Sequence, residues 1–118
     1  MSRRILRLNE TIKSALSDLI QNDLKDPRLG FITITGVEVA ADLRHAYVYI
    51  SVLGEEKDWK NSIAGLISAR KHLRLELGKK VKMKYVPEIE FKADRSIEEG
   101  MKIFDLIKKI SIEKDSND

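Results

Sequence analysis

The sequence predicts an α+β domain in which helices cover one face of a three-stranded sheet. Apolar residues recur at helical spacing in three stretches and alternate with polar residues in three shorter ones. The resulting order is α-β-β-α(α)-β-α, where the bracketed helix depends on whether the middle stretch is broken. Two adjacent strands, a helical connection and a third strand favour a two-layer arrangement. At 118 residues the chain has room for one such domain with a real core.

The first helix is expected to run from Arg3 to about Lys25. Pro27 ends it, because the residue before a proline is pushed out of the helical region. The apolar residues of this stretch fall three or four apart and form a wide stripe, as expected for an amphipathic helix. They are Ile5, Leu8, Ile12, Leu16, Leu19, Ile20 and Leu24.

A half-buried antiparallel hairpin follows the first helix. Its alternating pattern slips by one position at Gly36, which predicts a β-bulge. Residues 42–44 (Asp-Leu-Arg) are the expected turn. In the second strand Ala46, Val48, Ile50 and Val52 should face the core, and Tyr47, Tyr49 and Ser51 should face away from it.

The next helical stretch runs from Asp58 to Leu77 and is either one helix or two. Asp58 is the predicted N-cap, and Gly78 fits the position that closes a helix. The apolar stripe is interrupted at residues 70–72, so a kink is possible there.

A third strand is predicted over residues 88–93, directly after Pro87. Ser96 and Glu99 form a capping-box pattern that starts a last helix. The stretch from Glu113 to Asp118 is polar. The sequence therefore divides into a domain of residues 1–112 and a C-terminal tail of residues 113–118.

Composition argues against several functional classes. There is no cysteine, which excludes disulfides, cysteine-based zinc sites and thiol nucleophiles. No apolar run reaches the roughly 18–20 residues of a membrane-spanning helix, and the N-terminus lacks a signal-peptide core, so we expect a cytoplasmic protein. Phosphate-loop, dinucleotide and metal-ligand patterns are missing, so no cofactor is expected.

An enzymatic reading would depend on two histidines, His45 and His72. An acid–base pair between Asp42 and His45 can be imagined, but a solvated hairpin turn explains both residues better. We therefore expect a protein that is not an enzyme.

Charge is distributed unevenly along the chain. The net charge is +3, yet residues 70–84 contain seven Lys or Arg and one Glu, or +6. Such a concentration predicts a polyanion-binding surface, since phosphate binding depends on Lys and Arg. A solvated face that binds nothing is the alternative. The candidate residues are Arg70, Lys71, Arg74, Lys79, Lys80, Lys82 and Lys84, with Arg3, Arg4 and Arg7 as a second cluster.

Two finer expectations concern this surface. Lys80, Lys82 and Lys84 alternate with other residues, so a strand-like conformation would project all three to one side. Tyrosines could stack on unpaired bases. For Tyr47 and Tyr49, however, an exposed strand face is the simpler explanation.

Several blocks in fixed order resemble the ribosome-binding factor A family. They are RRILRLNETI, DLKDPRLG, ITITGVEVAADLRHAYVYISVLG, LISARKHLRLELG and MKYVPEIEFKADRSIEEGMKI. The resemblance covers about Arg3 to Ile110.

The resemblance implies a single KH-like domain of type II without catalytic activity. Members bind the small (30S) ribosomal subunit, act late in its assembly, and are associated with processing of the 5′ end of 16S rRNA and with growth in the cold. It implies the subunit and its rRNA as partners, and we expect a monomer that uses no membrane or small-molecule substrate. A protein–protein interaction module with a merely solvated basic face is the alternative.

The chain departs from the family at one position. Members usually carry an Ala-x-Gly kink between the paired helices, whereas residues 69–71 here are Ala-Arg-Lys. If Lys71 had to adopt a positive φ, it would be strained where a glycine would not be. The sequence leaves open a less sharp kink or one held by packing.

Overall fold

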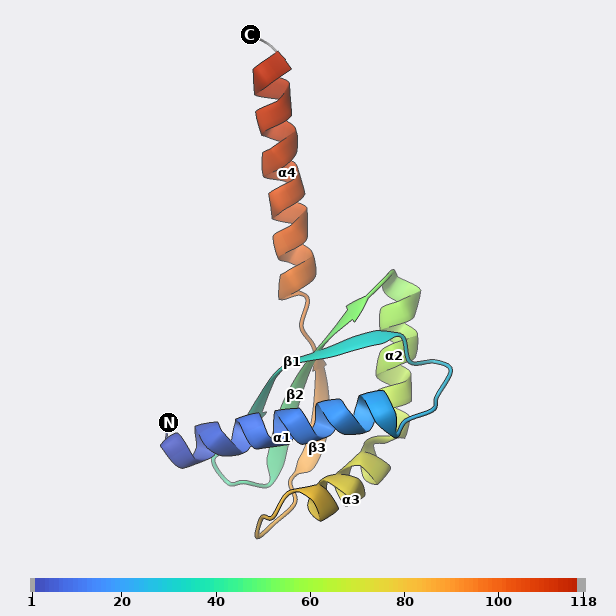
Figure 1. Ribbon diagram of the computed structural model, residues 1–118, viewed down its shortest axis with the longest axis vertical. Coiled ribbons are helices and arrows are strands. Elements are labelled where there is room, and N and C mark those ends of the chain that lie inside the picture. The colour runs from blue at the N-terminus through green and yellow to red at the C-terminus, as the bar shows by residue number, and fades with distance from the viewer. Residues whose placement is uncertain (1, 117–118) are drawn as a thin grey trace.

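The computed structural model describes residues 2–116, with side chains described for residues 2–112. It confirms the predicted order of elements and the three-stranded sheet (Figure 1). The elements are α1 (Arg3–Asn22), β1 (Phe31–Val39), β2 (His45–Leu53), α2 (Glu56–Ser68), α3 (Arg70–Lys80), β3 (Glu88–Ala93) and α4 (Ser96–Ser116).

The sheet has β2 at its centre, in the order β1-β2-β3. β1 pairs with β2 in antiparallel fashion, and β3 pairs with β2 in parallel. The parallel pairing is possible because α2 and α3 return the chain to the end of the sheet at which β2 begins. The register shifts between Ile34 and Gly36, so Thr35 is the extra residue of a bulge. The bulge predicted at Gly36 is thus confirmed.

The hairpin connection spans residues 40–44 and contains the predicted turn residues 42–44. The backbone N–H of Leu43 donates to the Ala40 carbonyl at 2.8 Å, and the N–H of Arg44 donates to Asp42 Oδ1 at 2.9 Å. Leu43 has a φ of 62° and is the one non-glycine residue with positive φ in the described chain. That conformation costs a leucine about 1–2 kcal/mol, which the turn and its two hydrogen bonds offset.

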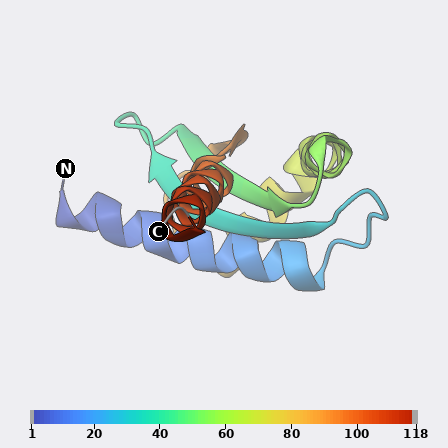
Figure 2. The same ribbon diagram turned by 90° about the horizontal axis from the view of Figure 1, so that it is seen from above.

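The core lies between the sheet and helices α1, α2 and α3. Seen from above, α1 runs beside β1, and α2 lies near the end of β2 (Figure 2). Ala46, Val48 and Ile50 of the central strand are completely buried, as their alternation predicted. The helices contribute Ile12, Leu16 and Leu19 from α1, Trp59 and Leu66 from α2, and Leu73 and Leu77 from α3.

One predicted end of each of the helices α1, α2 and α3 was wrong. α1 ends at Asn22 rather than near Lys25. α2 has Glu55 as its N-cap, with Asp58 three residues in, where its Oδ2 accepts from the N–H of Glu55 at 2.7 Å. Gly78 lies inside α3. A Cβ there would lie 2.9 Å from Val86 Cγ2, so this glycine allows the following loop to pack closely.

The sequence left open whether the middle helical stretch is one helix or two, and the structure has two, with the break at Ala69 rather than within residues 70–72. This residue ends α2 and starts α3 with φ −87° and ψ 0°. Lys71 lies within the first turn of α3 and does not have a positive φ. Lysine therefore replaces the family's glycine without backbone strain, since the direction of the chain changes at the alanine.

Helix α4 projects away from the rest of the molecule (Figure 1), and the molecule measures 65 × 37 × 20 Å. Ser96 lies inside the helix rather than at its cap, and its N–H donates to Asp94 Oδ1 at 3.0 Å. α4 continues to Ser116, so the predicted polar tail is helical over residues 113–116; residues 117–118 lie outside the described chain. No described helix is both long and apolar enough to cross a membrane.

Candidate nucleic-acid interface

The basic window of residues 70–84 occupies helix α3 and the loop before β3. Lys80 is the last residue of α3, and residues 81–87 form the loop. The strand-like conformation predicted for residues 80–84 is therefore wrong, because the helix continues through Gly78. Lys82 and Lys84 are nevertheless exposed, and partly buried Met83 between them packs against the core.

Arg70 and Lys71 lie in the first turn of α3, which contains no acidic residue. Backbone N–H groups at a helix N-terminus have no intrahelical partner, and the helix dipole is positive there. Two cations at that end are unfavourable for the free helix, because they lie at the positive end of its dipole. They add to the attraction of that end for an anion. Both side chains are exposed, and neither makes an ion pair with a described residue.

Arg74 has a structural role in addition to its predicted one. Its Nε and Nη2 donate to the Val86 carbonyl at 3.2 and 2.9 Å, and its Nη1 lies 3.9 Å from Glu88 Oε1. The guanidinium thus ties α3 to the residues that lead into β3. Its contact with RNA stays a prediction.

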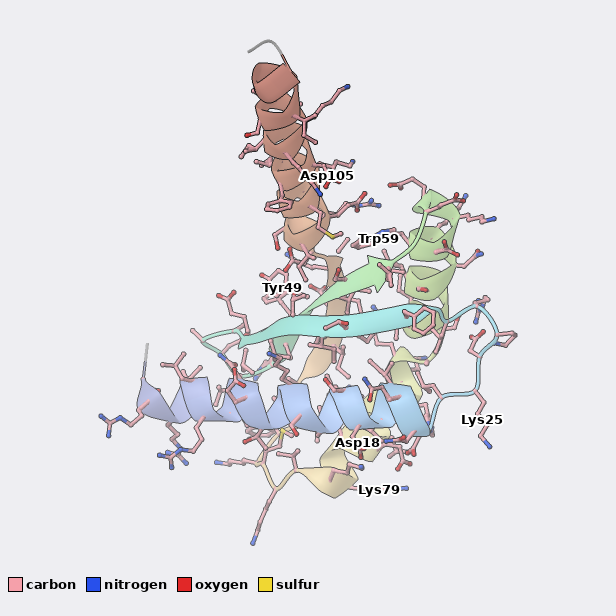
Figure 3. All side chains as sticks on the ribbon, turned by 45° about the horizontal axis from the view of Figure 1, so that its top comes forward. Asp18, Lys25, Tyr49, Trp59, Lys79 and Asp105 are labelled. Atoms are coloured by element: carbon pink, nitrogen blue, oxygen red, sulfur yellow. The ribbon has the colours of Figure 1, made fainter. Side chains whose placement is uncertain are left out.

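Lys79 and Lys80 also have acidic partners. Lys79 Nζ donates to Glu76 Oε1 at 3.1 Å, and Lys80 Nζ donates to Asp18 Oδ2 on α1. The hydrogen bond from Lys80, followed by one from Asn22, lowers the pKa of Asp18, while Asp18 raises the pKa of Lys80. Figure 3 labels Asp18 and Lys79 on these neighbouring helices. The pair of Lys80 and Asp18 joins residues 62 positions apart and cannot be predicted from the sequence. The pair of Glu76 and Lys79 could have been, because residues three apart are neighbours on a helix.

Four of the seven candidates make no ion pair with any described residue, and we call them the unpaired cations: Arg70, Lys71, Lys82 and Lys84. Two lie at the start of α3 and two in the loop after it. Lys84 also lies over the ring of Tyr85, with Nζ 5.7 Å from the centroid. Tyr85 is exposed, so a flat surface lies beside the charge.

Arg3, Arg4 and Arg7 lie in the first two turns of α1, and all are exposed. Ser2 caps the helix by accepting from the Ile5 N–H at 3.2 Å, but no acidic residue lies in the first turn. Arginines at the positive end of a helix dipole are unfavourable unless an anion binds there. Within the described part of the chain, none of these three arginines makes an ion pair.

The opposite face of the sheet carries a separate group of polar and aromatic side chains. The sequence analysis named its tyrosines, Tyr47 and Tyr49, but not Lys92. Lys92 Nζ lies 4.6 Å from the Tyr47 ring centroid, and Tyr49 Oη donates to Glu38 Oε2 at 3.4 Å. Both tyrosines are half-exposed on the outer face, which agrees with an ordinary strand surface. Alternation with Phe91 could have placed Lys92 on that face.

The imagined acid–base pair is not assembled. Asp42 accepts from the backbone in the hairpin turn, whereas His45 Nε2 lies 3.7 Å from Glu88 Oε2. Among residues 2–112, no group of three or more His, Cys, Asp or Glu could hold a metal ion.

Comparison with known proteins agrees with the resemblance seen in the sequence. The family model described as ribosome-binding factor A matches residues 4–107. A ribosome-binding factor A from Brevibacillus brevis is 47% identical over 115 residues, which cover 98% of this chain and 95% of that protein. One from Acetivibrio thermocellus is 51% identical over 109 residues, or 92% and 89% of the two chains.

The chain belongs to the ribosome-binding factor A family. Solved structures agree with this assignment. The crystal structure of ribosome-binding factor A from Thermus thermophilus matches with a TM-score of 0.70 at 30% identity, covering 78% of this chain and 98% of that one. A Thermotoga maritima structure described as a putative ribosome binding factor A has a TM-score of 0.72 at 33% identity, covering 81% and 92%.

A third match carries a partner in its description. It is a homology model of Thermus thermophilus ribosome binding factor A, fitted into the cryo-EM map of a 30S complex. Its TM-score is 0.65 at 31% identity, and the match covers 77% of this chain and 96% of the other. The likeness thus includes a protein placed on a small ribosomal subunit.

Proposed function

We propose that this chain is a non-catalytic assembly factor that binds the small (30S) ribosomal subunit through its 16S rRNA. It assists late maturation, including processing of the rRNA 5′ end, in the cytoplasm. The observation that carries the proposal is membership of a family in which a relative has been fitted into the map of a 30S complex. The exposed cations of this chain supply a chemical means of binding RNA.

The unpaired cations are the primary phosphate contacts of this proposal. Arg70 and Lys71 combine side-chain charge with the positive end of α3, while Lys82 and Lys84 extend the charge along the loop. Arg74, Lys79 and Lys80 are secondary, because a phosphate must compete with partners they already have. Arg3, Arg4 and Arg7 are a separate contact at the start of α1.

Such a factor acts through binding energy alone. A protein that prefers one conformation of the immature subunit shifts the subunit toward that conformation by its difference in affinity. No covalent step is involved, so the processing nuclease is a separate protein whose access to the rRNA 5′ end depends on that conformation. Slow rearrangement of RNA in the cold makes this assistance more important, which accounts for an expected cold-sensitive phenotype.

The salt dependence of binding tests the phosphate contacts. With about four to six phosphates contacted, log K for single-stranded RNA should fall with log salt at a slope of roughly −3 to −4. Substituting Arg70→Glu and Lys71→Glu together should make the slope shallower by about 1.4. The matched control is Lys57→Glu with Lys60→Glu, which makes the same charge change on exposed positions of α2. An equal loss in both variants would contradict a local site.

Sucrose-gradient fractionation of lysate tests the partner. We expect the protein to comigrate with free small subunits at low salt, to leave them at high salt, and to be absent from polysomes. Deletion strains grown in the cold should accumulate 16S precursor with an unprocessed 5′ end, and the Arg70/Lys71 variant should not restore processing. If the protein instead stays with a protein partner after nuclease treatment of the lysate, the interaction-module alternative is correct.

A further inference from the structure

The first half of β1, residues 31–35, lies at an edge of the sheet. In the order β1-β2-β3, β1 pairs with a strand on one side only. An edge strand presents unpaired backbone N–H and C=O groups at alternate residues. Val39 shows which residues these are, because its N–H points away from β2 and donates to Asn9 Oδ1 on α1 at 2.9 Å.

The backbones of Ile32 and Ile34 have the same orientation as that of Val39. All three pair with alternate residues of β2 between Ala46 and Val52, because the bulge keeps the two strands in step. Their N–H and C=O groups therefore face the edge. Beyond the pairing with β2, no hydrogen bond among the described residues involves the N–H of Ile32 or Ile34.

A groove of about 510 Å³, which we call the α1–β1 groove, lies along this edge. Its walls are β1 and the end of α1, which runs beside β1 in Figure 2. α1 contributes Ile20, Gln21 and Leu24, and the chain before β1 contributes Leu29. A narrower hollow of about 70 Å³ adjoins Ile34. The groove thus has room for side chains directly beside the edge of the strand.

Two further features indicate what the groove accepts. Phe31 is 79% exposed at the start of β1, so a strand added at this edge would cover part of an apolar ring. The last turn of α1 has no basic residue, although carbonyl groups at the C-terminal end of a helix attract cations. The charged side chain that lines the groove, Asp26, is also acidic. A lysine or arginine of a bound segment would therefore be favoured near the end of α1.

We propose that the α1–β1 groove binds an extended segment of another protein as a fourth strand, antiparallel to β1. In such strand addition, main-chain hydrogen bonds to the edge supply affinity and pockets for alternate side chains supply specificity. The segment has apolar side chains at alternate positions, which enter the groove beside Ile20 and Leu24. It ends in Lys or Arg, because its C-terminal end lies at Phe31 and the last turn of α1.

This surface differs in chemistry from the basic window of residues 70–84. A phosphate backbone requires cations, whereas the charged side chain in the groove is a carboxylate. A protein backbone in extended conformation supplies donors and acceptors at the spacing of the edge. The groove therefore fits a peptide rather than RNA.

Fluorescence polarisation with a labelled seven-residue peptide tests the proposal. Valine and threonine alternate over its first five positions, starting with valine, and two lysines follow. We expect a dissociation constant below about 1 mM, which Gln21→Trp should raise at least about tenfold, since the indole fills the groove. The control is Glu10→Trp, at an exposed position of α1 that does not line the groove. Equal effects of both variants, or no binding to the wild type, would overturn the proposal.

Methylated peptides test whether backbone hydrogen bonds hold the segment. The valines face the groove, so their N–H groups point at β1, whereas the N–H groups of the threonines point away. Methylating the valine nitrogens should weaken binding at least about tenfold, and methylating the threonine nitrogens should change it less than about twofold. Equal weakening would show that side chains alone hold the peptide, and would refute strand addition.

Hydrogen exchange followed by NMR locates the peptide on the strand. The amides of Ile32 and Ile34 should exchange more slowly when the peptide is present, whereas the amide of Thr33, which faces β2, should be unchanged. If a higher protein concentration alone produced the same slowing, a second copy would occupy the edge and the proposal would be wrong. None of these measurements contains RNA, so their failure and the failure of 30S binding are distinguishable.

Discussion

The two long helices of this protein, α1 and α4, are almost equal in length but opposite in surroundings. α1 has 20 residues and buries Ile12, Leu16 and Leu19 completely against the sheet and α3. α4 has 21 residues, and no large apolar side chain described on it is less than half exposed. Two helices of nearly equal length therefore have opposite surroundings within one chain: α1 has a pronounced apolar stripe that packs on the sheet and α3, whereas α4 is less amphipathic and projects from the domain.

The base of α4 is nevertheless fixed to the domain. Arg95 donates to Glu56 at the start of α2, lies 3.2 Å from Glu98, and stacks on the Trp59 ring at 4.1 Å. Asp94 accepts from Thr35 Oγ1 at 2.6 Å. Polar and cation–π contacts thus hold the start of α4, whereas α1 is held mainly by burial of its apolar residues from Ile12 to Ile20. Figure 3 shows Asp105 on the projecting part of α4.

The largest difference between the two regions is expected in how much stability is lost when a core side chain or an α4 side chain is truncated. Leu66→Ala or Ile50→Ala should lower the free energy of unfolding by about 2–5 kcal/mol, because both side chains are completely buried. Ile107→Ala, which truncates a side chain of α4 that is more than half exposed, should lower it by less than about 0.5 kcal/mol. Urea denaturation followed by circular dichroism measures both. Equal losses would mean that α4 packs on the domain.

Asn9 tests how tightly α1 is joined to the sheet. Its Oδ1 accepts from the Val39 N–H at 2.9 Å, and both residues are buried. Asn9→Ala should cost about 1–3 kcal/mol, because it leaves a buried backbone donor without a partner. Thr11→Ala is the control, since Thr11 is exposed and bonds only within its own helix. Hydrogen exchange should show faster exchange at Val39 in Asn9→Ala, and an unchanged rate would contradict this role.

Low pH should weaken the contacts at the base of α4, because two carboxylates there, Glu56 and Asp94, have a lowered pKa in the folded protein. A hydrogen bond from Arg95 lowers the pKa of Glu56 from its usual 4.5, and bonds from Ser96 and Thr35 lower that of Asp94 from 3.8. Because the folded values lie below the unfolded ones, this contribution is complete above about pH 5 and is lost as the pH falls through the folded values.

Melting temperature as a function of pH measures this contribution. It should be level from pH 7 to 5 and fall below that, and Glu56→Gln should lower it by a small amount at pH 7 that shrinks toward pH 3. A constant difference between Glu56→Gln and the wild type at every pH would show that ionisation of Glu56 contributes nothing.

Much of the fold was predictable because it depends on local patterns. The alternation of residues 46–52 placed the right side chains in the core, and the slip at Gly36 located the bulge. The bounds of β3 were predicted without error, since Pro87 fixes its start. Helix ends were less predictable. Glycine at position 78 looked like a terminator, but the loop around Val86 requires it for close packing.

The candidate surface was predictable in composition but not in its pairing. Charge counting identified the basic window, yet it could not show that Asp18 lies beside Lys80 or that Arg74 bonds to the Val86 carbonyl. Those contacts join residues far apart in sequence. The exposure of α4 was unpredictable for the same reason, since periodicity indicates an apolar face without indicating what covers it.

The parallel pairing of β2 and β3 has a consequence for how the chain folds during synthesis. β1 and β2 are neighbours in sequence and can pair as soon as the hairpin is complete, whereas Ala46 must wait for Ile89, 43 residues later. Contacts between distant residues form slowly because a long loop must close first. Until β3 is synthesised, one edge of the central strand is open to other chains. α2 and α3 are synthesised before β3, so Trp59 and Leu66 can pack on the core side of the hairpin while that edge is still open.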